Sequence, residues 1–508
     1  MAEKRQFQAI KGVRDILPPE SALWNRVEQT AREVFGTFGF AEIRLPIFED
    51  TELFARSVGQ ETDIVSKEMY TFVDRPLELP AKPTMGEIPG YIEAIGHLMH
   101  SGAIPKSQAN VERLKFLTDE IKELYPLFEK SVERYADRLL VLSYAIEDFQ
   151  LGPEISLRPE ATASVVRAYT EHGMQTLPGN VKLYYMGPMF RRERPQKGRY
   201  RQFYQIGAEV LGSSDAPGID AEVIEMLLAF FERLKLKGAV LHINSIGDKN
   251  CRPAYVERLH AELQKVREQL GADSQRRIET NPLRVLDSKL EHEQAIIEKL
   301  PRIADHLCAE CRAHYDEVKR QLALRGIAYQ ENWRLVRGLD YYMRTTFEIT
   351  APGLGSQNAV CGGGRYDGLV ELLGGPATTK GIGFAIGTDR LVLSLQESGV
   401  GEVSGGPARP AGGLDVYLAW FGAAAQTAAV GLARRLRDAG FVVELPAVEM
   451  KFGKSLGLAD RLKARHAVIL GEDELAAGVV AVKRLADGTQ QKLAEQDLFS
   501  HLRAARDF

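Results

Sequence analysis

The sequence predicts a protein of more than one domain in which strands and helices are mixed, and three observations support this prediction. The chain of 508 residues is long enough for two or three domains with substantial cores. Two strand-like runs flank an arginine-rich loop within residues 182–210, as in an antiparallel hairpin. A segment rich in Gly, Pro and Ser, residues 398–413, precedes a part in which strand-like and helical patterns alternate. We therefore expect a sheet with helices, followed by a small α/β domain.

The hairpin has the features of a phosphate-binding surface. In its second run, the even-numbered residues from 204 to 210 form an apolar face and the odd-numbered residues from 203 to 209 form a polar one. Gly207 has no side chain, which leaves room for a ligand to lie against the sheet. Arg191 and Arg199 bracket the loop, and their guanidinium groups suit bidentate contacts with phosphate. The alternative is a solvated basic hairpin that binds nothing.

The last hundred residues have the pattern of a separate α/β domain. Residues 414–419 and 467–471 look like strands, and residues 424–439 and 455–464 have helical spacing. A generic α/β domain has the same pattern, so this segment alone indicates no RNA binding.

Two long helical stretches interrupt the parts that predict strands. Residues 248–326 form one of them. The other lies at residues 75–147, with helical periodicity at 111–127 and 127–146. A connection of that length needs structure of its own.

Composition argues against several classes of protein. A formal charge of −4 and a pI near 6.3 do not indicate a general nucleic-acid binder, so any RNA contact must use a local basic patch. Four cysteines in a chain of this length fit a reducing cytosol better than a disulfide framework. The N-terminus is charged, and no run approaches the ~20 apolar residues of a membrane span. We therefore expect a cytoplasmic protein that makes no use of a membrane.

The hairpin, with Arg-x-Glu-Arg-Pro-Gln-Lys-Gly-Arg-Tyr-Arg-Gln-Phe at residues 191–203, resembles the second signature motif of class II aminoacyl-tRNA synthetases. The residue sequence of this motif is similar to that of histidyl-tRNA synthetases in particular. Further segments resemble motifs of the same family in the expected order: residues 40–49, 155–164, 335–347, 361–368 and 381–393. The resemblance covers residues 7–74 and 149 to the C-terminus.

This resemblance implies an α+β catalytic domain, a class II antiparallel sheet flanked by helices, at residues 1–397. Residues 248–326 match the helical insertion of the family, residues 398–413 are a linker, and residues 414–508 correspond to an α/β anticodon-binding domain. The segment at 40–49 resembles the motif that forms the interface of a homodimer. The stretch at 75–147 departs from the family; a neutral insertion is the reading we adopt, with an RNA-contacting or dimer-stabilising role as the alternative.

The implied activity is that of a histidine–tRNA ligase, which forms histidyl-adenylate from L-histidine and ATP and transfers histidine to its tRNA. Negative charge accumulates around the α-phosphorus, so fixed cations must meet it. The resemblance gives this catalytic role to Arg191, Arg337 and Arg390. It assigns ATP binding to Arg191, Glu193, Arg199, Phe203 and Arg390, with Mg²⁺ on the ATP phosphates.

For histidine, the resemblance assigns Glu160, Thr162, Gln205, Glu209, Arg337, Tyr341, Tyr342 and Tyr366. A neutral imidazole offers one donor and one acceptor, and a carboxylate with a hydroxyl, here Glu209 with Tyr342, complements both. Arg337 and Tyr342 would point to opposite faces of a regular strand, so a bend at Gly338 must bring them to one pocket. A plain half-buried strand is the alternative.

For the tRNA acceptor end, the resemblance assigns Arg194, Gln196 and Lys197 in the loop. Cationic side chains supply salt-dependent affinity, and specificity comes from base edges. The proton acceptor in the transfer step is either a phosphate oxygen of the adenylate or Glu160.

Three alternatives remain. A pattern at residues 306, 308, 311 and 314, His-x-Cys-x-x-Cys-x-x-His, has spacing that could gather zinc ligands, but without a second pair we expect no metal there. A catalytically silent regulatory relative from histidine biosynthesis would lack the catalytic arginines and the C-terminal domain, both of which this chain has. A general RNA-binding protein would not need the histidine pocket.

Overall fold

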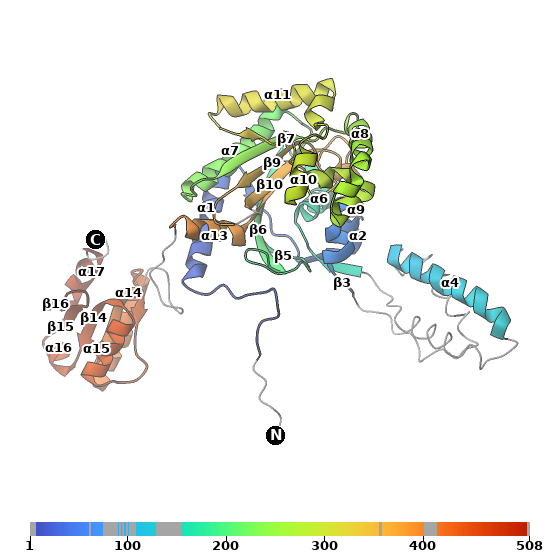
Figure 1. The fold of residues 1–508 in the computed structure, drawn as a ribbon. Coiled ribbons are helices and arrows are strands. Elements are labelled where there is room, and N and C mark those ends of the chain that lie inside the picture. Colours follow the sequence, from blue (N-terminus) through green and yellow to red (C-terminus); the bar gives the residue numbers. More distant parts are fainter. Residues whose placement is uncertain are drawn as a thin grey trace. The chain divides into compact units, whose positions relative to one another are not determined.

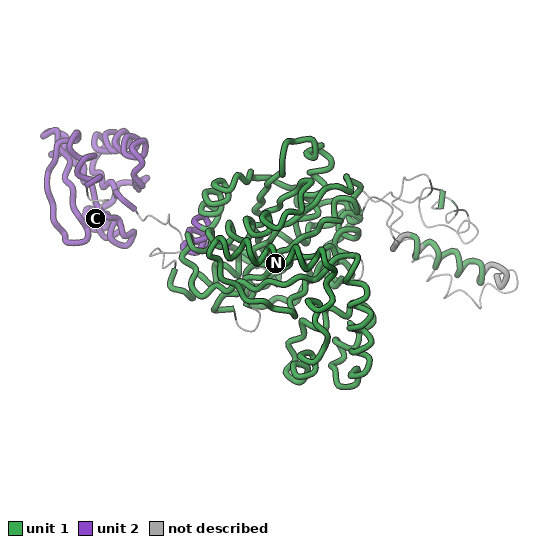
Figure 2. Tube along the Cα trace, turned by 90° about the horizontal axis from the view of Figure 1, so that it is seen from above, with its two compact units in different colours: residues 1–15, 27–400 green, residues 16–26, 401–508 purple. Residues whose placement is uncertain are grey.

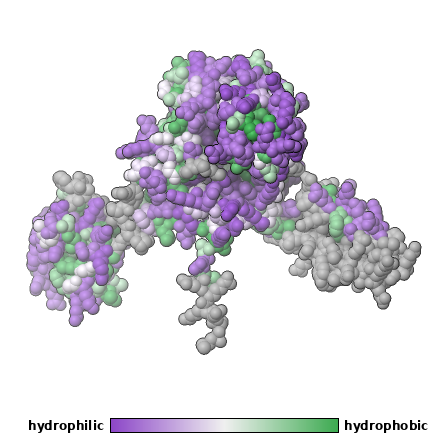
Figure 3. Space-filling model, in the orientation of Figure 1, coloured by the Kyte–Doolittle hydropathy of each residue, from purple (hydrophilic) through white to green (hydrophobic). Residues whose placement is uncertain are grey.

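The computed structural model describes residues 7–59, 62–74, 108–128, 154–354, 358–400 and 414–504, together with a few isolated positions between 90 and 100. The chain divides into two compact units, one made of residues 1–15 and 27–400 and the other of residues 16–26 and 401–508 (Figure 2). On the face shown in Figure 3, hydrophilic residues cover most of the described surface. Within the described parts, no helix combines the length and the apolar character needed to cross a membrane.

The larger unit is built on a central sheet of eight strands in the order β1-β5-β6-β11-β10-β9-β7-β8 (Figure 1). The strands are β1 (Ala41–Glu42), β5 (Val181–Phe190), β6 (Gln202–Gly212), β11 (Lys380–Gly387), β10 (Ala359–Arg365), β9 (Met343–Thr350), β7 (Val240–Ser245) and β8 (Gln330–Glu331). Only the two outermost pairs, β1–β5 and β7–β8, are parallel. The predicted antiparallel sheet is confirmed.

The predicted hairpin is β5 and β6, and it lies inside this sheet. The two strands pair from Val181 opposite Leu211 to Phe190 opposite Gln202, and β11 flanks β6 on the other side. The apolar face is buried as expected; on the face expected to be polar, Glu209 is buried, with 1% of it exposed, while Phe203 and Gln205 are half-buried and line a cavity. The hairpin is therefore not the solvated element of the alternative interpretation, and its most exposed part is the loop.

Helices cover both faces of the sheet. They are α1 (Glu20–Thr37), α2 (Thr51–Val58), α6 (Thr162–Glu171), α7 (Pro217–Arg233), α12 (Leu369–Leu372) and α13 (Thr388–Glu397). On one face, Phe35 packs against Phe230 of α7 and Phe384 of β11, with ring centroids 5.5 and 6.0 Å apart. On the other face, α6 packs its buried Val165 and Tyr169 into a core that includes Tyr185 of β5. A smaller sheet of β2 (Phe48–Asp50), β4 (Glu154–Leu157) and β3 (Tyr70–Val73) lies beside α2.

The stretch predicted to be helical at residues 248–326 is helical. It contains α8 (Arg252–Lys265), α9 (Ala272–Thr280), α10 (Glu291–Ile297) and α11 (Ala309–Leu324), and α11 packs against α7 (Figure 1). In the stretch at 75–147, α4 (Gln108–Phe128) agrees with the periodicity at 111–127. The second helix expected there, at 127–146, and most of the linker at 398–413 lie outside the described residues.

The C-terminal residues form a five-stranded sheet in the order β13-β12-β14-β15-β16. Its strands are β12 (Leu414–Trp420), β13 (Val443–Glu444), β14 (Ala464–Leu470), β15 (Val479–Arg484) and β16 (Gln490–Ala494), with helices α14 (Ala423–Asp438), α15 (Phe452–Arg461), α16 (Glu472–Ala476) and α17 (Glu495–Ala504). The two predicted strands and two predicted helices are all present. The second helix ends earlier than expected, because Lys463 adopts a left-handed conformation, with φ of 49°, and Ala464 begins β14.

Candidate active site

A cavity of about 1080 Å³ opens on the central sheet, at the base of the arginine-rich loop. The residues predicted from the sequence that line it are Arg191, Glu193, Arg199, Phe203, Gln205, Arg337 and Arg390. They come from the β5–β6 hairpin, the segment before β9, and the start of α13. Residues far apart in the sequence thus meet in one place.

Two arginines of the hairpin are held in position by neighbouring acceptors. The Arg191 amide donates to the Arg201 carbonyl, which closes the base of the loop. Arg191 Nε donates to the Pro159 carbonyl at 2.9 Å, and its guanidinium lies 5.2 Å from the Phe203 ring centre. Arg199 Nη1 lies 3.3 Å from Glu193 Oε2. Both cations are therefore oriented before any ligand arrives.

Arg337 lies over the glycines of β10. Its Nη1 is 3.2 Å from Glu348 Oε2, while its Nε is buried without a hydrogen-bond partner among the described residues. A Cβ added to Gly362 would collide with the guanidinium, so a residue without a side chain is needed there. The guanidinium centre is 5.8 Å from the Tyr342 ring. Residues 332–342 form no strand and bend at Gly338, which brings the two together as predicted and excludes the half-buried strand.

Arg390 lies in the first turn of α13, as the sequence predicts. Burial and the nearby Arg199 both lower the pKa of its guanidinium from the ordinary value. Two cations that repel each other in a partly buried cavity favour an anionic ligand between them.

The residues predicted for the imidazole form a buried cluster. The Thr162 hydroxyl donates to Glu209 Oε1 at 2.7 Å, and the Tyr366 hydroxyl donates to Glu209 Oε2 at 2.6 Å. Tyr341 packs against Tyr342 and Tyr366, with ring centroids 4.7 and 5.8 Å apart. The structure thus brings these residues together. None of them lines the cavity, because their side chains pack against one another.

Glu160 has a structural task in this state. Its two carboxylate oxygens accept the backbone N–H groups of Thr162 and Ala163, at 2.7 and 3.0 Å, at the start of α6. Burial raises the pKa of its carboxyl from the ordinary value.

Two buried oxygen atoms near this cluster have no hydrogen-bond partner within the described residues, namely Gln205 Oε1 and the Tyr185 hydroxyl. Tyr185 was not predicted from the sequence. It lies opposite Gly207 in the hairpin, and its ring occupies the position that a Cβ on Gly207 would take. The space expected over Gly207 is therefore filled by the Tyr185 ring. The pairing of a tyrosine with a glycine across the hairpin is the sequence feature that could have indicated this.

Two carboxylates of the cavity were also missed. Glu348 of β9 pairs with Gly362 in the sheet and contacts Arg337. Glu68 lies near Glu193, and burial together with the charge of Glu193 raises the pKa of its carboxyl. Neither residue belongs to a recognisable motif, so only the register of the strands could have indicated them.

The residues assigned to the tRNA acceptor end, Arg194, Gln196 and Lys197, are exposed on the loop. A left-handed Gly198, with φ of 74°, turns the chain there, and the Gln196 and Arg199 backbones pair across the turn. Lys197 Nζ lies 3.7 Å from Glu397. The loop therefore presents polar side chains to solvent above the cavity residues.

The pKa of Glu209 gives a testable pH dependence. Burial raises this pKa from 4.5 to about 8, so between these values the folded protein holds a proton that the unfolded chain has lost. Stability must then fall as pH rises toward about 8, and this group has no further effect above that value. We expect the free energy of unfolding from urea titrations of the ligand-free protein to fall, relative to that of Glu209→Gln, between about pH 6 and about pH 8, by at most about 1.4 kcal/mol per pH unit. The same pH dependence of the free energy of unfolding in both proteins would contradict the raised pKa of Glu209.

An antiparallel sheet with arginines from a hairpin, a bent loop and a helix start around one cavity is the fold and site of a class II aminoacyl-tRNA synthetase. Comparison with known proteins gives the particular family. Residues 125–391 match the family model of histidyl-tRNA synthetase, and residues 415–505 match that of the anticodon binding domain. The chain therefore belongs to the histidyl-tRNA synthetase family.

Individual relatives agree over the whole length. The chain is 46% identical over 499 residues to the histidine–tRNA ligase of Solibacter usitatus, which covers 98% of this chain and 99% of that protein. It is 46% identical over 501 residues to that of Koribacter versatilis, covering 98% and 96%. The crystal structure of apo Staphylococcus aureus histidyl-tRNA synthetase superposes with a TM-score of 0.68 at 32% identity, covering 98% of this chain and 100% of that one. A Bacillus halodurans C structure, described as an ATP phosphoribosyltransferase regulatory subunit/histidyl-tRNA synthetase, shares the fold with a TM-score of 0.57 at 18% identity.

Proposed function

We propose that this protein is a histidine–tRNA ligase that activates L-histidine with ATP and then transfers it to the 3′ end of histidine tRNA. The observation that carries the residue-level proposal is Arg337, whose buried Nε has no hydrogen-bond partner in the described part of the chain and which shares a cavity with Arg191 and Arg390. A carboxylate and a phosphate that meet in this cavity would supply an acceptor for Arg337 Nε and negative charge beside Arg191 and Arg390.

In the first step, a carboxylate oxygen of histidine bonds to the α-phosphorus of ATP, and the bond from that phosphorus to pyrophosphate breaks. No proton is transferred, so the protein's task is to position the reactants and to offset charge. Arg337 bridges the carboxylate and the α-phosphate, and Arg191, at the end of β5, also holds the α-phosphate. Their fixed orientation means that little reorganisation is needed when charge develops.

ATP binds along the hairpin. Phe203 stacks on the adenine, with a sequence-tolerant π-face. Arg199 and Arg390 take the outer phosphates, which relieves the repulsion between them. Mg²⁺ enters on the phosphates of ATP; Glu68 and Glu193, two carboxylates that repel each other, offer the oxygen ligands this ion prefers.

Histidine binds beside Arg337. Its α-ammonium group donates to Gln205 Oε1 and the Tyr185 hydroxyl, which have no hydrogen-bond partner within the described residues, with Glu160 and Thr162 nearby. The imidazole must replace existing hydrogen bonds, because Thr162 and Tyr366 already occupy both oxygens of Glu209. We infer that Tyr341, Tyr342 and Tyr366 shift when histidine enters, and that a side chain unable to exchange these hydrogen bonds is rejected.

In the transfer step, the exposed residues Arg194, Gln196 and Lys197 contact the acceptor end of the tRNA, and the C-terminal unit contacts the anticodon. Both oxygens of Glu160 are used by backbone N–H groups. We therefore favour a phosphate oxygen of the adenylate as the proton acceptor.

The protein acts as a cytoplasmic homodimer in this proposal. The segment at residues 40–49 carries two exposed hydrophobic side chains, Ile47 and Phe48, which are 44% and 57% exposed. Adjacent apolar residues of this size are typical of surfaces that pair with another protein. The cysteines are all free, which fits a reducing compartment.

The test of this function is amino-acid-dependent exchange of pyrophosphate into ATP, with each of the twenty amino acids offered separately. Exchange with histidine alone is expected. Histidine binding without exchange would replace the proposal with the regulatory relative, and RNA binding without either would leave only a general RNA-binding protein.

Deleting residues 75–147 should leave adenylation measurable. β3 and β4 pair as neighbours, with Val73 opposite Glu154, so the stretch leaves and re-enters the fold at adjacent positions. A short turn can therefore close the gap without moving the active site. Exchange activity within about tenfold of the full-length value is expected. A deletion variant that still unfolds in one cooperative transition but has no activity would show that the stretch belongs to the active enzyme.

A further inference from the structure

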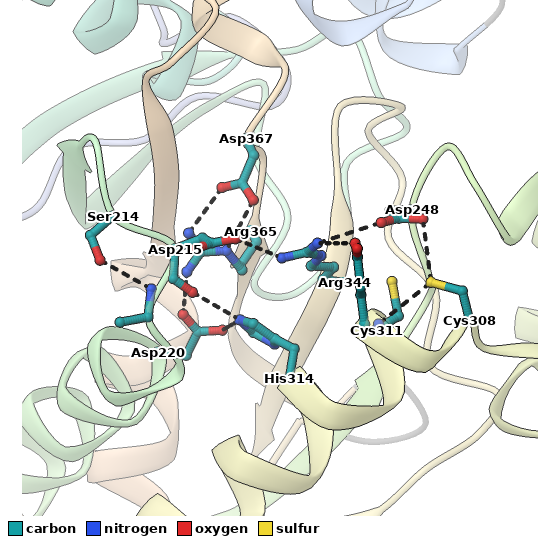
Figure 4. Close-up of polar contacts among 12 residues, drawn as sticks. Ser214, Asp215, Asp220, Asp248, Cys308, Cys311, His314, Arg344, Arg365 and Asp367 are labelled. Carbon is teal, nitrogen blue, oxygen red and sulfur yellow. Dashed lines mark hydrogen bonds and ion pairs between the residues drawn. The ribbon is translucent and has the colours of Figure 1, made fainter.

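Three of the four cysteines gather at one place outside the active-site cavity. Asp248, Cys251, Cys308 and Cys311 each offer one ligand atom, and these four atoms all lie within 4.8 Å of one another. Cys308 is half-buried and the other three are buried. Figure 4 shows Asp248, Cys308 and Cys311 turned toward one another at the start of α11. None of the four lines the cavity described above.

The sequence pattern at 306–314 indicated only half of this cluster, and the wrong partners. Its two histidines lie elsewhere: His314 Nε2 is 3.2 Å from the Asp215 carbonyl, and the His306 ring packs against Tyr255. The second pair of ligands, Asp248 and Cys251, comes from a turn far upstream in the chain. The missing second pair was the reason for expecting no metal, so that reason no longer holds.

The distances fit a tetrahedral ion. Asp248 Oδ1 lies 3.6 Å from Cys251 Sγ and 4.0 Å from Cys308 Sγ. A zinc ion with Zn–S of about 2.3 Å and Zn–O of about 2.0 Å separates a sulfur from an oxygen by about 3.5 Å. Small adjustments of side chains therefore bring all four atoms to bonding distance.

The backbone is arranged to favour thiolates. The Asp248 amide points at Cys251 Sγ, 3.4 Å away, and the Cys311 amide points at Cys308 Sγ, 3.5 Å away. Cys251 and Cys308 also precede the first residues of α8 and α11, where the helix dipole stabilises negative charge. The two helix starts thus converge on the cluster.

Once its thiols are deprotonated, the cluster requires a cation. Three thiolates and a carboxylate carry more negative charge than a buried site tolerates alone. Arg344 Nη2 lies 3.5 Å from Asp248 Oδ2 and offsets part of it (Figure 4).

We propose that Asp248, Cys251, Cys308 and Cys311 bind one Zn²⁺ ion in a closed tetrahedral site. Soft thiolate ligands select Zn²⁺ over Mg²⁺ and Ca²⁺, and four protein ligands leave no position for a substrate. Binding replaces up to three thiol protons, which pass to solvent, and no electron is transferred. The site is structural.

The site supports the segment that carries the histidine-binding tyrosines. The Arg344 amide donates to the Gly247 carbonyl at 2.7 Å, next to Asp248. Arg252, which follows Cys251, donates from Nη1 to the Tyr342 carbonyl at 2.7 Å. An ion that fixes the turn at 247–251 therefore also fixes the backbone between Tyr342 and Arg344.

The experiment measures metal in the full-length, untagged protein, purified under reducing conditions without a chelator. Inductively coupled plasma mass spectrometry should find about one zinc per chain. Cobalt exchanged into the site should give thiolate-to-cobalt charge-transfer absorption and the intense visible bands of tetrahedral Co²⁺. Less than about a tenth of a zinc ion per chain, in protein reconstituted with Zn²⁺ and dialysed, would overturn the proposal. A disulfide between Cys308 and Cys311 in protein isolated under these reducing conditions would also overturn the proposal.

Variants assign the ligands. Cys308→Ser with Cys311→Ser should lower the zinc content at least tenfold, and Asp248→Asn should weaken retention against a chelator by about 10- to 100-fold. Cys361→Ser and His306→Gln are matched controls, because the first removes the one cysteine outside the cluster and the second a histidine of the sequence pattern; both should keep the zinc. If the cysteine variants do not fold, wild-type protein decides: zinc should protect three thiols from alkylation, and equal labelling with and without zinc would overturn the site.

Discussion

Replacing Arg337 with alanine is expected to abolish histidine-dependent pyrophosphate exchange, with a loss in kcat/KM of about 10³-fold or more, or about 4 kcal/mol. The guanidinium is one of the cations of the cavity, and its Nε is buried without a partner among the described residues. In the proposed mechanism its removal takes away a cation that holds the attacking carboxylate and offsets the negative charge that develops around the α-phosphorus. The same change leaves Glu348 without the cation beside it, which adds repulsion toward ATP.

A control separates this effect from damage to the fold. Arg325 is about as exposed as Arg337, with 25% and 22% of the side chain accessible, and is also paired with a glutamate, Glu225. Because Arg325 lies at the end of α11 and does not line the cavity, Arg325→Ala should keep nearly full activity. Arg337→Lys restores the charge without the planar fork and should recover only part of the rate. Retained activity in a folded Arg337→Ala protein would remove this residue from the mechanism.

The sequence predicted the large features well because they depend on local patterns. The alternation around Gly207 predicted a strand. The glycine-rich linker predicted where the C-terminal α/β domain begins. The helical spacing at residues 248–326 predicted helices that the structure contains. Motif order added the positions of Arg191, Arg337 and Arg390, and the structure brings these three to one cavity.

Features that depend on tertiary contacts were not accessible in this way. Tyr185 reaches the site only because it faces Gly207 across the hairpin, and Glu348 only because it faces Gly362. The face of β6 that the alternation marked as polar is buried, since Glu209 finds its partners on α6 and after β10. Cys251 joins Cys308 through packing of two helix starts, which no spacing within either segment predicts.

Replacing Glu209 with glutamine is expected to raise the KM for histidine about 10²-fold or more, equivalent to about 3 kcal/mol, while the KM for ATP changes little. Glutamine keeps the size of the side chain but replaces one carboxyl oxygen with an NH2 group, which donates and cannot accept. Thr162 and Tyr366 both donate to Glu209, so a glutamine amide facing either of them leaves a buried donor unsatisfied. The difference between the two substrates arises because Glu209 does not line the cavity that holds the arginines.

The measurement is pyrophosphate exchange at varied histidine and saturating ATP, then at varied ATP and saturating histidine. Tyr366→Phe, which removes one donor and keeps the carboxylate, should raise the histidine KM by a smaller factor, about tenfold. Glu222→Gln is the matched control, since Glu222 lies on α7, outside the site, and pairs with Lys182 of β5. An unchanged histidine KM in Glu209→Gln would mean that the imidazole is recognised elsewhere. A parallel rise in both KM values would mean that Glu209 supports the fold of the sheet instead of reading the substrate, because only a group that contacts histidine can separate the two.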